Sequence, residues 1–410
     1  MAASGAASLK EDAPPPPAPP IRRPPPPTLP PVPSSPATVP LLGFVDLQVN
    51  GVGGISFSAL TLTAASCMAA CERLLDAGCA CILPTVITSP VEVYAHVLPL
   101  LADACESERL RGRVLGIHLE GPFISDQPGA VGCHPPAHVL DPANGGIALF
   151  DQLMSLSRGH VRLLTIAAEG RGAAELCAHA IAAGVVVSLG HQLATAEQIH
   201  ELAACGASLL THLGNGCPAV VNRHANPIWA GLAEDRLSAM LITDGVHLPR
   251  DVLVAMLRAK GLSRVIVTSD VAPVACLPCG TYQCFGSSVH VEGSAIRSAD
   301  RSCLAGSGAL MLECMNHLAG LRAWVVDEAG VDAGSTLCTG GDVGTAAGGE
   351  VGLSLEQLLL VGFDNPLRAL GLSPESTRRA LEAACVGPLV EWCGGQFRLR
   401  SACPPCHAES

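Results

Sequence analysis

The sequence predicts an α/β fold in which eight parallel strands close into a TIM-like barrel. Two observations indicate this fold. Eight short apolar runs alternate with helix-like segments along most of the chain, and each run ends at or near a residue that can carry chemistry. The reactive groups of such a barrel collect at the carboxyl ends of its strands. We therefore expect a catalytic site at that end of the barrel.

The predicted strands share a short length and a content of mainly aliphatic residues. They span residues 44–49, 79–87, 114–119, 162–168, 185–189, 208–213, 237–243 and 264–269. Polar residues stand at or just past their ends, namely Gln48, Asn50, Thr88, Glu120, Glu169, His191, His212, Asp244, His247 and Asp270. Helices are expected between them over 63–77, 91–105, 173–183, 196–205 and 251–259.

One of these helices has readable ends. Thr195 and Gln198 form a capping-box pattern, in which two side chains satisfy the free amides at a helix start. Gly206 then supplies the stop, because glycine readily adopts the left-handed conformation that ends many helices. The pattern therefore predicts a helix that begins after Thr195.

Composition shifts divide the chain into three parts. Residues 1–40 are rich in proline and are expected to be disordered, while residues 41–375 hold the barrel. Within the barrel, residues 271–303 are expected to form an insertion over its mouth, and about 328–352 a Gly-rich loop. Helical character is expected over 310–324, 355–361 and 366–370. Residues 376–410 are expected to be an atypical C-terminal tail and show no clear period.

The charge and hydropathy of the chain exclude several classes of partner. The formal net charge of -12 argues against nucleic acid, which is bound by clustered Lys and Arg. No apolar run reaches the roughly 18 residues of a membrane span, and the N-terminus lacks an apolar signal core. We expect a cytoplasmic protein whose 19 cysteines are mainly reduced core thiols. Two C-x-x-C pairs, Cys276 with Cys279 and Cys403 with Cys406, are weak motifs.

Three of the strand-end residues form a set that suits a metal ion. Catalytic zinc commonly takes three protein ligands from His and carboxylate and keeps one position open for water, and Glu120, His191 and His212 supply such a set. Asp270 ends the eighth run and can accept a proton from the activated water. These four residues together predict a hydrolytic metal site.

Several short motifs occur in an order that is typical of one enzyme family. They are GFVDLQVNG, HLEGPF, the GH of residues 190–191, THLGN, TDGVH, LAGS and DNPLRALGL. Over residues 43–372 the chain resembles the N-acetylglucosamine-6-phosphate deacetylases of the amidohydrolase superfamily. The resemblance implies a (β/α)8 barrel of the amidohydrolase type. The family's small β-sandwich domain, built from both chain ends, is expected to be reduced or missing.

The resemblance also implies a role for each matching residue. Many amidohydrolases hold a second metal with a His-x-His pair, and here that position reads Gln48-Val49-Asn50, as in single-metal members of the family. Glu120, His191 and His212 match the metal ligands, Asp270 the catalytic aspartate, and His134 a residue that binds and polarises the acetamido carbonyl. The substrate-binding residues implied are Gln48, Asn50, His134, Asn215, Gly216, Arg223, His247 and Leu304. Arg223 and His247 match groups that contact the phosphosugar partly across a dimer interface.

The function expected from these residues is metal-dependent deacetylation of N-acetylglucosamine 6-phosphate to glucosamine 6-phosphate and acetate. One divalent ion is implied, with zinc favoured and ferrous iron or another divalent ion also suited to the ligands. The expected partner is a small phosphosugar, without nucleic acid or membrane, and the resemblance allows a homodimer. Two alternatives are an amidohydrolase acting on a different amide or cyclic imide, and a barrel that binds ligands without catalysis.

Overall fold

The computed structural model describes residues 38–323 and 351–400, and its centre is a sheet of eight parallel strands. In sheet order the strands are β11 (Val265–Thr268), β10 (Ser238–Ile242), β9 (Leu209–Leu210), β8 (Val186–Leu189), β7 (Val161–Ile166), β6 (Ile117–Glu120), β5 (Cys79–Ile87) and β2 (Phe44–Val49). A parallel bridge between Val49 and Val271 joins the two ends of the sheet. The predicted TIM-like barrel is confirmed.

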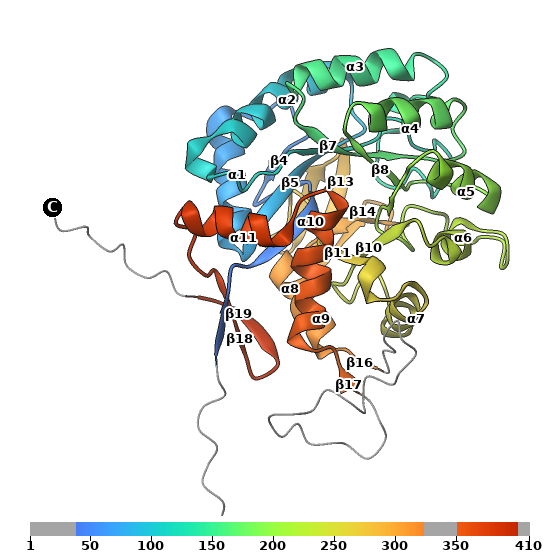
Figure 1. The fold of residues 1–410 in the computed structure, drawn as a ribbon. Coiled ribbons are helices and arrows are strands. Elements are labelled where there is room, and N and C mark those ends of the chain that lie inside the picture. Colours follow the sequence, from blue (N-terminus) through green and yellow to red (C-terminus); the bar gives the residue numbers. More distant parts are fainter. Residues whose placement is uncertain (1–37, 324–350, 401–410) are drawn as a thin grey trace, which may run out of the picture. The chain divides into compact units, whose positions relative to one another are not determined.

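Helices surround the sheet on its outer side (Figure 1). They are α1 (Ala64–Asp76), α2 (Val91–Glu106), α3 (Gly146–Leu156), α4 (Ala173–Ala182), α5 (Ala196–Ala204), α6 (Pro227–Ala233), α7 (Arg250–Lys260), α8 (Met311–Gly320), α9 (Leu355–Leu359), α10 (Asn365–Ala369) and α11 (Pro374–Ala383). The capping box of Thr195 and Gln198 is present at the start of α5, as predicted. Helices α3, α6 and α11 were not predicted.

Alternation along the strands sorts side chains into two hydrophobic clusters. In β2, Phe44 packs in the larger cluster with residues of the surrounding helices, whereas Val45 and Leu47 pack in a second cluster with residues of β5, β7 and β10. Val49, which lies beyond a register shift in β2, also belongs to the larger cluster. Phe363 and Leu367 belong to this second cluster. Because successive strand residues point to opposite faces, one short strand serves both clusters.

A polar layer crosses the barrel near the ends of the strands. His118 Nε2 lies 2.8 Å from Thr165 Oγ1, and Thr165 Oγ1 lies 2.8 Å from Thr211 Oγ1. Ser188 Oγ continues the chain at 2.6 Å from Thr211 Oγ1. These buried groups satisfy one another, and they link β6, β7 and β8 to the residue that follows β9.

The expected insertion after β11 is a four-stranded antiparallel sheet. Its strands are β12 (Gly280–Cys284), β13 (Ser287–Glu292), β14 (Ala295–Ser298) and β15 (Leu304–Ser307). It has its own small apolar cluster, which includes Val289 and Ile296, and a bridge between Val271 and Ser307 ties it to the barrel. The sheet is thereby held beside the mouth of the barrel.

Both ends of the described chain meet in a three-stranded antiparallel sheet. It consists of β1 (Val39–Leu41), β18 (Val390–Cys393) and β19 (Gln396–Leu399), with β18 in the middle (Figure 1). Residues 390–399, to which we assigned no structure, therefore form a hairpin that packs Phe397 against Phe44. The family's β-sandwich domain, which is built from both chain ends, was expected to be reduced or missing. In the described chain, both ends contribute to this three-stranded sheet.

Some predictions fall on residues outside the described ranges. These are residues 1–37 of the segment 1–40 that was expected to be disordered, most of the Gly-rich loop, and the pair Cys403 and Cys406. The expectation of disorder is wrong for Val39 and Pro40, which belong to β1. At the edges of that loop, β16 (Arg322–Ala323) pairs with β17 (Val351–Gly352). The described cysteines are all free thiols, and both Cys276 and Cys279 are exposed.

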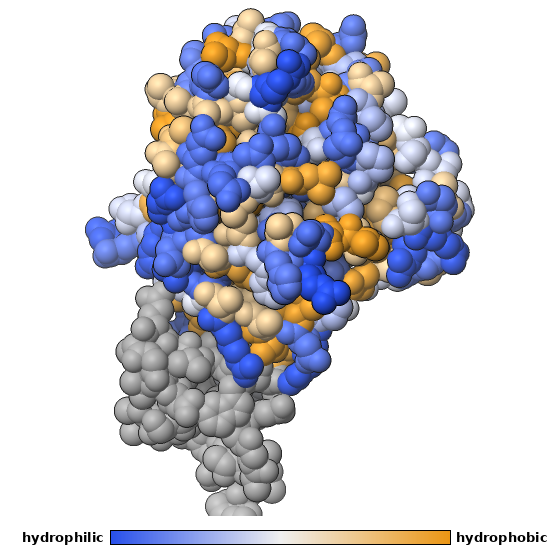
Figure 2. Space-filling view, turned by 90° about the vertical axis from the view of Figure 1, so that its right-hand side faces the viewer, coloured by the Kyte–Doolittle hydropathy of each residue, from blue (hydrophilic) through white to orange (hydrophobic). Residues whose placement is uncertain are grey.

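Among the described residues, no helix is long and apolar enough to span a bilayer. On the face drawn in Figure 2, hydrophilic residues cover most of the surface and hydrophobic residues lie between them in small groups. The most exposed large apolar side chains include Val220 and Trp229, which lie before and within α6.

Candidate metal centre

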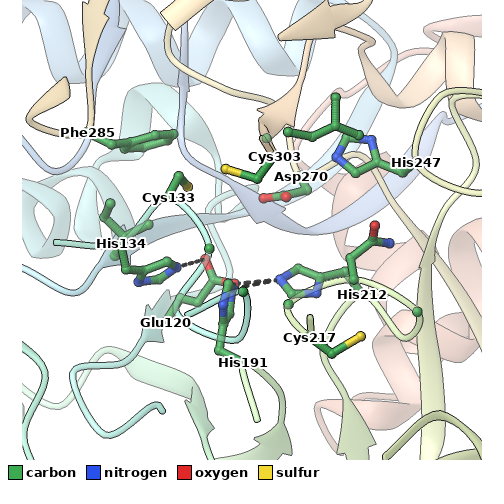
Figure 3. A pocket seen from close by; sticks show the side chains of 18 of the residues that line it. Glu120, Cys133, His134, His191, His212, Cys217, His247, Asp270, Phe285 and Cys303 are labelled. Carbon is green, nitrogen blue, oxygen red and sulfur yellow. Dashed lines mark hydrogen bonds and ion pairs between the residues drawn. The ribbon is translucent and has the colours of Figure 1, made fainter. Parts of the chain in front are cut away.

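Glu120, His191 and His212 converge at the carboxyl end of the barrel (Figure 3). Glu120 is the last residue of β6, and the two histidines each stand two residues past the ends of β8 and β9. Glu120 Oε1 lies 3.2 Å from His191 Nε2 and 2.9 Å from His212 Nε2, and the two Nε2 atoms are 3.1 Å apart. All three residues are buried.

The backbone at these strand ends is unusual. His191, His212 and Asp270 have φ angles of 50°, 30° and 50°, which lie in the left-handed region that non-glycine residues seldom adopt. Such conformations persist only where the surrounding structure enforces them, and they gather at functional sites. Gly216, at φ 60°, leaves room for the two rings, since a Cβ there would lie 3.0 Å from His212 Cε1.

Hydrogen bonds around the cluster orient its donor atoms. His191 Nδ1 donates to the Ala130 carbonyl at 2.8 Å, which orients its Nε2 toward Glu120. Gln48 Nε2 donates to Glu120 Oε1 at 2.8 Å. The buried His212 Nδ1 has no hydrogen-bond partner among the described residues. A carboxylate and an imidazole held by such partners, with a second imidazole beside them, fit a divalent ion with an open coordination position.

The electrostatics of the cluster favour bound positive charge. Burial raises the pKa of Glu120, but the hydrogen bonds of His191 and His212 outweigh it and hold that pKa well below its ordinary value. Burial likewise opposes the charged form of His212, and Glu120 raises the pKa of that ring above its usual value. Since metal ligands must bind the ion in their deprotonated form, a divalent ion would compete with protons for the side chains of Glu120, His191 and His212.

Asp270 faces the cluster from the end of β11 (Figure 3). Asn50 Nδ2 donates to Asp270 Oδ1 at 2.8 Å. Burial, together with the negative charge of Glu120, raises the pKa of Asp270 to about 6. A carboxyl group with a pKa near neutrality can both accept and return a proton.

His134 approaches Glu120 from the loop that follows β6. Its Nδ1 accepts a hydrogen bond from the Thr88 amide at 3.3 Å, so Nε2 carries the proton. This Nε2 lies 3.7 Å from Glu120 Oε2. Burial, reinforced by His191, lowers the pKa of His134 to about 3. The ring is therefore a neutral donor aimed at the site.

A second carboxylate–imidazole pair lies across the pocket. His247 Nδ1 is 2.7 Å from Asp244 Oδ2, and Ser307 Oγ donates to the same oxygen at 2.8 Å. Burial raises the pKa of Asp244, but its bond with His247 outweighs this and lowers the value to about 2. Asp244 therefore stays ionised and fixes the ring of His247, which lines the pocket.

Ten of the twelve predicted site residues line one cavity of about 230 Å³. They are Asn50, Glu120, His134, His191, His212, Asn215, Gly216, His247, Asp270 and Leu304. Gln48 lies behind Glu120 and outside the cavity lining, where it contacts that ligand. Arg223 is exposed outside the cavity, and its carbonyl accepts a hydrogen bond from Trp229 Nε1 at 2.9 Å.

Other residues of the cavity were missed. Cys133, Cys217, Phe285 and Cys303 line it, and Phe285 and Cys303 come from the four-stranded insertion. Thr88 was noted only as a strand-end residue, although it orients His134. The expected position of the insertion over the mouth was the one signal for Phe285 and Cys303, and no local pattern distinguishes Cys133 or Cys217.

A parallel barrel with a carboxylate and two imidazoles gathered at its carboxyl end is the arrangement expected of a metal-dependent hydrolase of the amidohydrolase class. Curated sequences agree with that class. The chain is 34% identical to N-acetylglucosamine-6-phosphate deacetylase from Bos taurus over 67% of this chain and 68% of that protein. It is also 34% identical to N-acetylgalactosamine-6-phosphate deacetylase from Shewanella over 68% of each chain. The chain belongs to the N-acetylglucosamine-6-phosphate deacetylase family.

Solved structures agree on the fold. N-acetyl-D-glucosamine-6-phosphate deacetylase from Mycobacterium smegmatis matches with a TM-score of 0.68 and 24% identity over 91% of both chains. The corresponding enzyme from Thermotoga maritima matches with a TM-score of 0.68 and 23% identity over 89% of this chain and 90% of that one. No family model matches the chain. The sequence-based resemblance is confirmed at the level of the family.

Proposed function

We propose that this protein hydrolyses the acetamido group of N-acetylglucosamine 6-phosphate, giving glucosamine 6-phosphate and acetate. The observation that carries the proposal is that Glu120, His191 and His212 share one cavity with Asp270 and His134. Glu120, His191 and His212 would hold one divalent ion, and zinc suits these ligands best. When bound, the ion would lower the pKa of a water molecule to about 7 and polarise the amide carbonyl.

The protein side chains would divide the remaining chemistry between them. Asp270 accepts a proton from the attacking water and passes it to the nitrogen of the leaving amine, so that the C–N bond breaks with a neutral amine departing. His134 Nε2–H donates to the oxygen of the carbonyl, on which negative charge develops. Its low pKa keeps the ring neutral, so it acts as a hydrogen-bond donor without competing for the proton that Asp270 moves.

Other residues of the cavity would bind the sugar. Asn215, Gly216, His247 and Leu304 line the cavity. Arg223 offers a planar fork suited to phosphate, but it lies outside the cavity, so its contact with the phosphate would come from a second subunit. Asn50, which holds Asp270, and Gln48, which holds Glu120, would act on the substrate through these partners. The free thiols fit a cytoplasmic enzyme.

One relative favours a second candidate substrate. Because the Shewanella protein is named N-acetylgalactosamine-6-phosphate deacetylase, the epimeric sugar phosphate competes with N-acetylglucosamine 6-phosphate as the preferred substrate. Both proposals share the metal, Asp270 and the acetamido group. They differ only in how the sugar hydroxyls are held.

The test is a comparison of kcat/KM among substrates with zinc-loaded protein. N-acetylglucosamine 6-phosphate, its galacto epimer, unphosphorylated N-acetylglucosamine and a cyclic imide are compared, and acetate or ring opening is measured. We expect the gluco phosphate to be the best substrate and the unphosphorylated sugar to be at least tenfold poorer. Ring opening without acetate release would instead identify a cyclic imide hydrolase. A folded, metal-loaded protein that converts none of them would favour the non-catalytic barrel.

A further inference from the structure

The barrel is closed between β2 and β11, and few backbone bonds cross that seam. These two strands stand at opposite ends of the sheet order, and a bridge between Val49 and Val271 joins them together with the bond from Asn50 N to the Val271 carbonyl at 2.9 Å. Asn50 and Asp270, which face the cavity, lie on opposite sides of this seam. Other contacts across the seam are therefore needed to keep Asn50 and Asp270 in fixed positions relative to each other.

A buried carboxylate supplies these contacts. Asp46 is 1% exposed and lies in β2, two residues before Gln48. Its Oδ1 accepts from Thr268 Oγ1 at 2.7 Å, from Ser269 N at 3.1 Å and from Gln48 N at 3.3 Å. Its Oδ2 accepts from the hydroxyl of Ser269. Four donors from both sides of the seam thus converge on one side chain.

The hydroxyl of Ser269 has a second role that Thr268 does not share. While it donates to Asp46, it accepts a hydrogen bond from the Val271 amide at 3.1 Å. These two bonds fix the chain on both sides of Asp270, and we say that they bracket this residue. Asp270 is the residue of this segment whose backbone is in the strained left-handed conformation. The Asp270 carbonyl in turn accepts from Ser307 N at 2.8 Å. The strain at Asp270 is contained by these neighbours.

We propose that Ser269, held by Asp46 across the seam, is a positioning residue that keeps the Asp270 carboxylate in its reactive orientation. The proposal rests on the proposed function, because it assigns Asp270 the proton transfers of that reaction. Ser269 is not among the residues that line the cavity, and its hydroxyl bonds to Asp46 and Val271. Its effect is on the geometry of proton transfer, for which misplacement by about 1 Å can cost roughly 100-fold in rate.

Thr268 provides a matched control. Thr268→Val removes a buried hydroxyl that donates to the same carboxylate, but Asp46 Oδ1 keeps two backbone donors and the bonds on either side of Asp270 remain. Ser269→Ala removes both the link to Asp46 and the acceptor of the Val271 amide. Thr268→Val loses one buried hydrogen bond, to Asp46, whereas Ser269→Ala loses two, and only Ser269→Ala removes the bonds on both sides of Asp270.

The experiment measures kcat, KM, zinc content and amide hydrogen exchange in the full chain for both variants. For Ser269→Ala we expect kcat to fall roughly 10-fold to 100-fold, with KM changed less than about threefold and zinc retained. Exchange in a peptide spanning residues 268–273 should become faster in this variant. For Thr268→Val we expect kcat and this exchange to match the wild type.

The possible outcomes separate this proposal from the proposed function. An unchanged kcat in Ser269→Ala, or equal losses of kcat in the two variants, would overturn the positioning role. If the wild type itself releases no acetate, the proposed function fails, and the exchange rates alone then decide whether Ser269 brackets Asp270. Should Ser269→Ala not fold, Asp46→Asn replaces it, because an amide in that place accepts fewer of the four donors, and kcat should again fall while KM stays.

Discussion

At the scale of single residues, the chemistry of the site depends on two carboxylates with opposite tendencies. Hydrogen bonds from two imidazoles keep Glu120 ionised, whereas burial raises the pKa of Asp270 to about 6. The pair therefore divides into a permanent anion suited to a metal and a group suited to proton transfer. His134 adds a neutral donor.

The clearest residue-scale prediction concerns Asp270. Asp270→Asn keeps the shape of the side chain but cannot accept a proton, so we expect kcat to fall about 10²-fold to 10⁴-fold. Zinc content should stay at the wild-type level, because the ligands are other residues. Steady-state kinetics and metal analysis check both parts. Asp251→Asn, at an exposed position of α7, is the control and should leave kcat unchanged.

A second residue-scale prediction concerns pH. Lys260 is buried with its Nζ donating to the Glu234 carbonyl at 2.6 Å, and burial, with Arg264 nearby, lowers its pKa to about 8. Below that pH the folded protein must keep the charge buried, which is unfavourable. Between pH 8 and the ordinary value of about 10.5 the penalty is relieved, because the folded state loses the proton first.

The measurement is urea unfolding of the wild type and Lys260→Met from pH 7 to 10. The difference in unfolding free energy, wild type minus variant, should be constant up to about pH 8 and should then rise with pH. Other titrating groups cancel in this difference. A difference that stays flat or falls over the same range would show that Lys260 titrates normally.

At the scale of elements, the sequence predicted what local pattern determines. All eight strands were found because each is a short apolar run, and α5 was bounded correctly by Thr195 and Gly206. Helix α3 was missed because it begins after a glycine without a side-chain cap. Helix α6 carries readable signals, an Asn226 cap and a proline in its first turn, but its short length hid it.

The cap of α5 gives an element-scale prediction. Thr195→Ala removes the side-chain acceptor for the Gln198 amide and should lower the free energy of unfolding by about 1 kcal/mol. Glu201→Ala, at an exposed position of the same helix, should change it by less than about 0.5 kcal/mol. Urea denaturation measures both. If the two substitutions lower the free energy of unfolding equally, the Thr195 cap does not stabilise α5 specifically. Helix α5 lies between the two predicted histidine ligands in the sequence.

At the scale of the whole molecule, the site depends on contacts that no local pattern reveals. The ligand types could be predicted from strand ends, since a barrel brings those ends together. The left-handed backbone of His191, His212 and Asp270 could not be, and neither could the contact of Asp46 with Ser269, 223 residues away. Part of the cavity wall, including Phe285 and Cys303, comes from an insertion whose packing only the folded chain specifies.

Metal removal is the prediction that belongs to the whole molecule. An ion that binds the native state and not the unfolded chain stabilises the fold by about 2.7 kcal/mol when its concentration is 100 times its dissociation constant. Chelation should therefore lower the midpoint of thermal unfolding, and added zinc should restore it. If neither chelation nor added zinc changes the midpoint of thermal unfolding, the result would contradict binding of a divalent ion at the strand ends.

The central claim is that Glu120, His191 and His212 bind one divalent ion together. Metal analysis of the purified wild type and of Glu120→Gln, after equilibration with zinc and removal of the excess, tests it most directly. We predict about one ion per chain in the wild type and far less in the variant, with both proteins folded by circular dichroism. A folded wild type without metal, or a variant that retains a full equivalent, would contradict the claim.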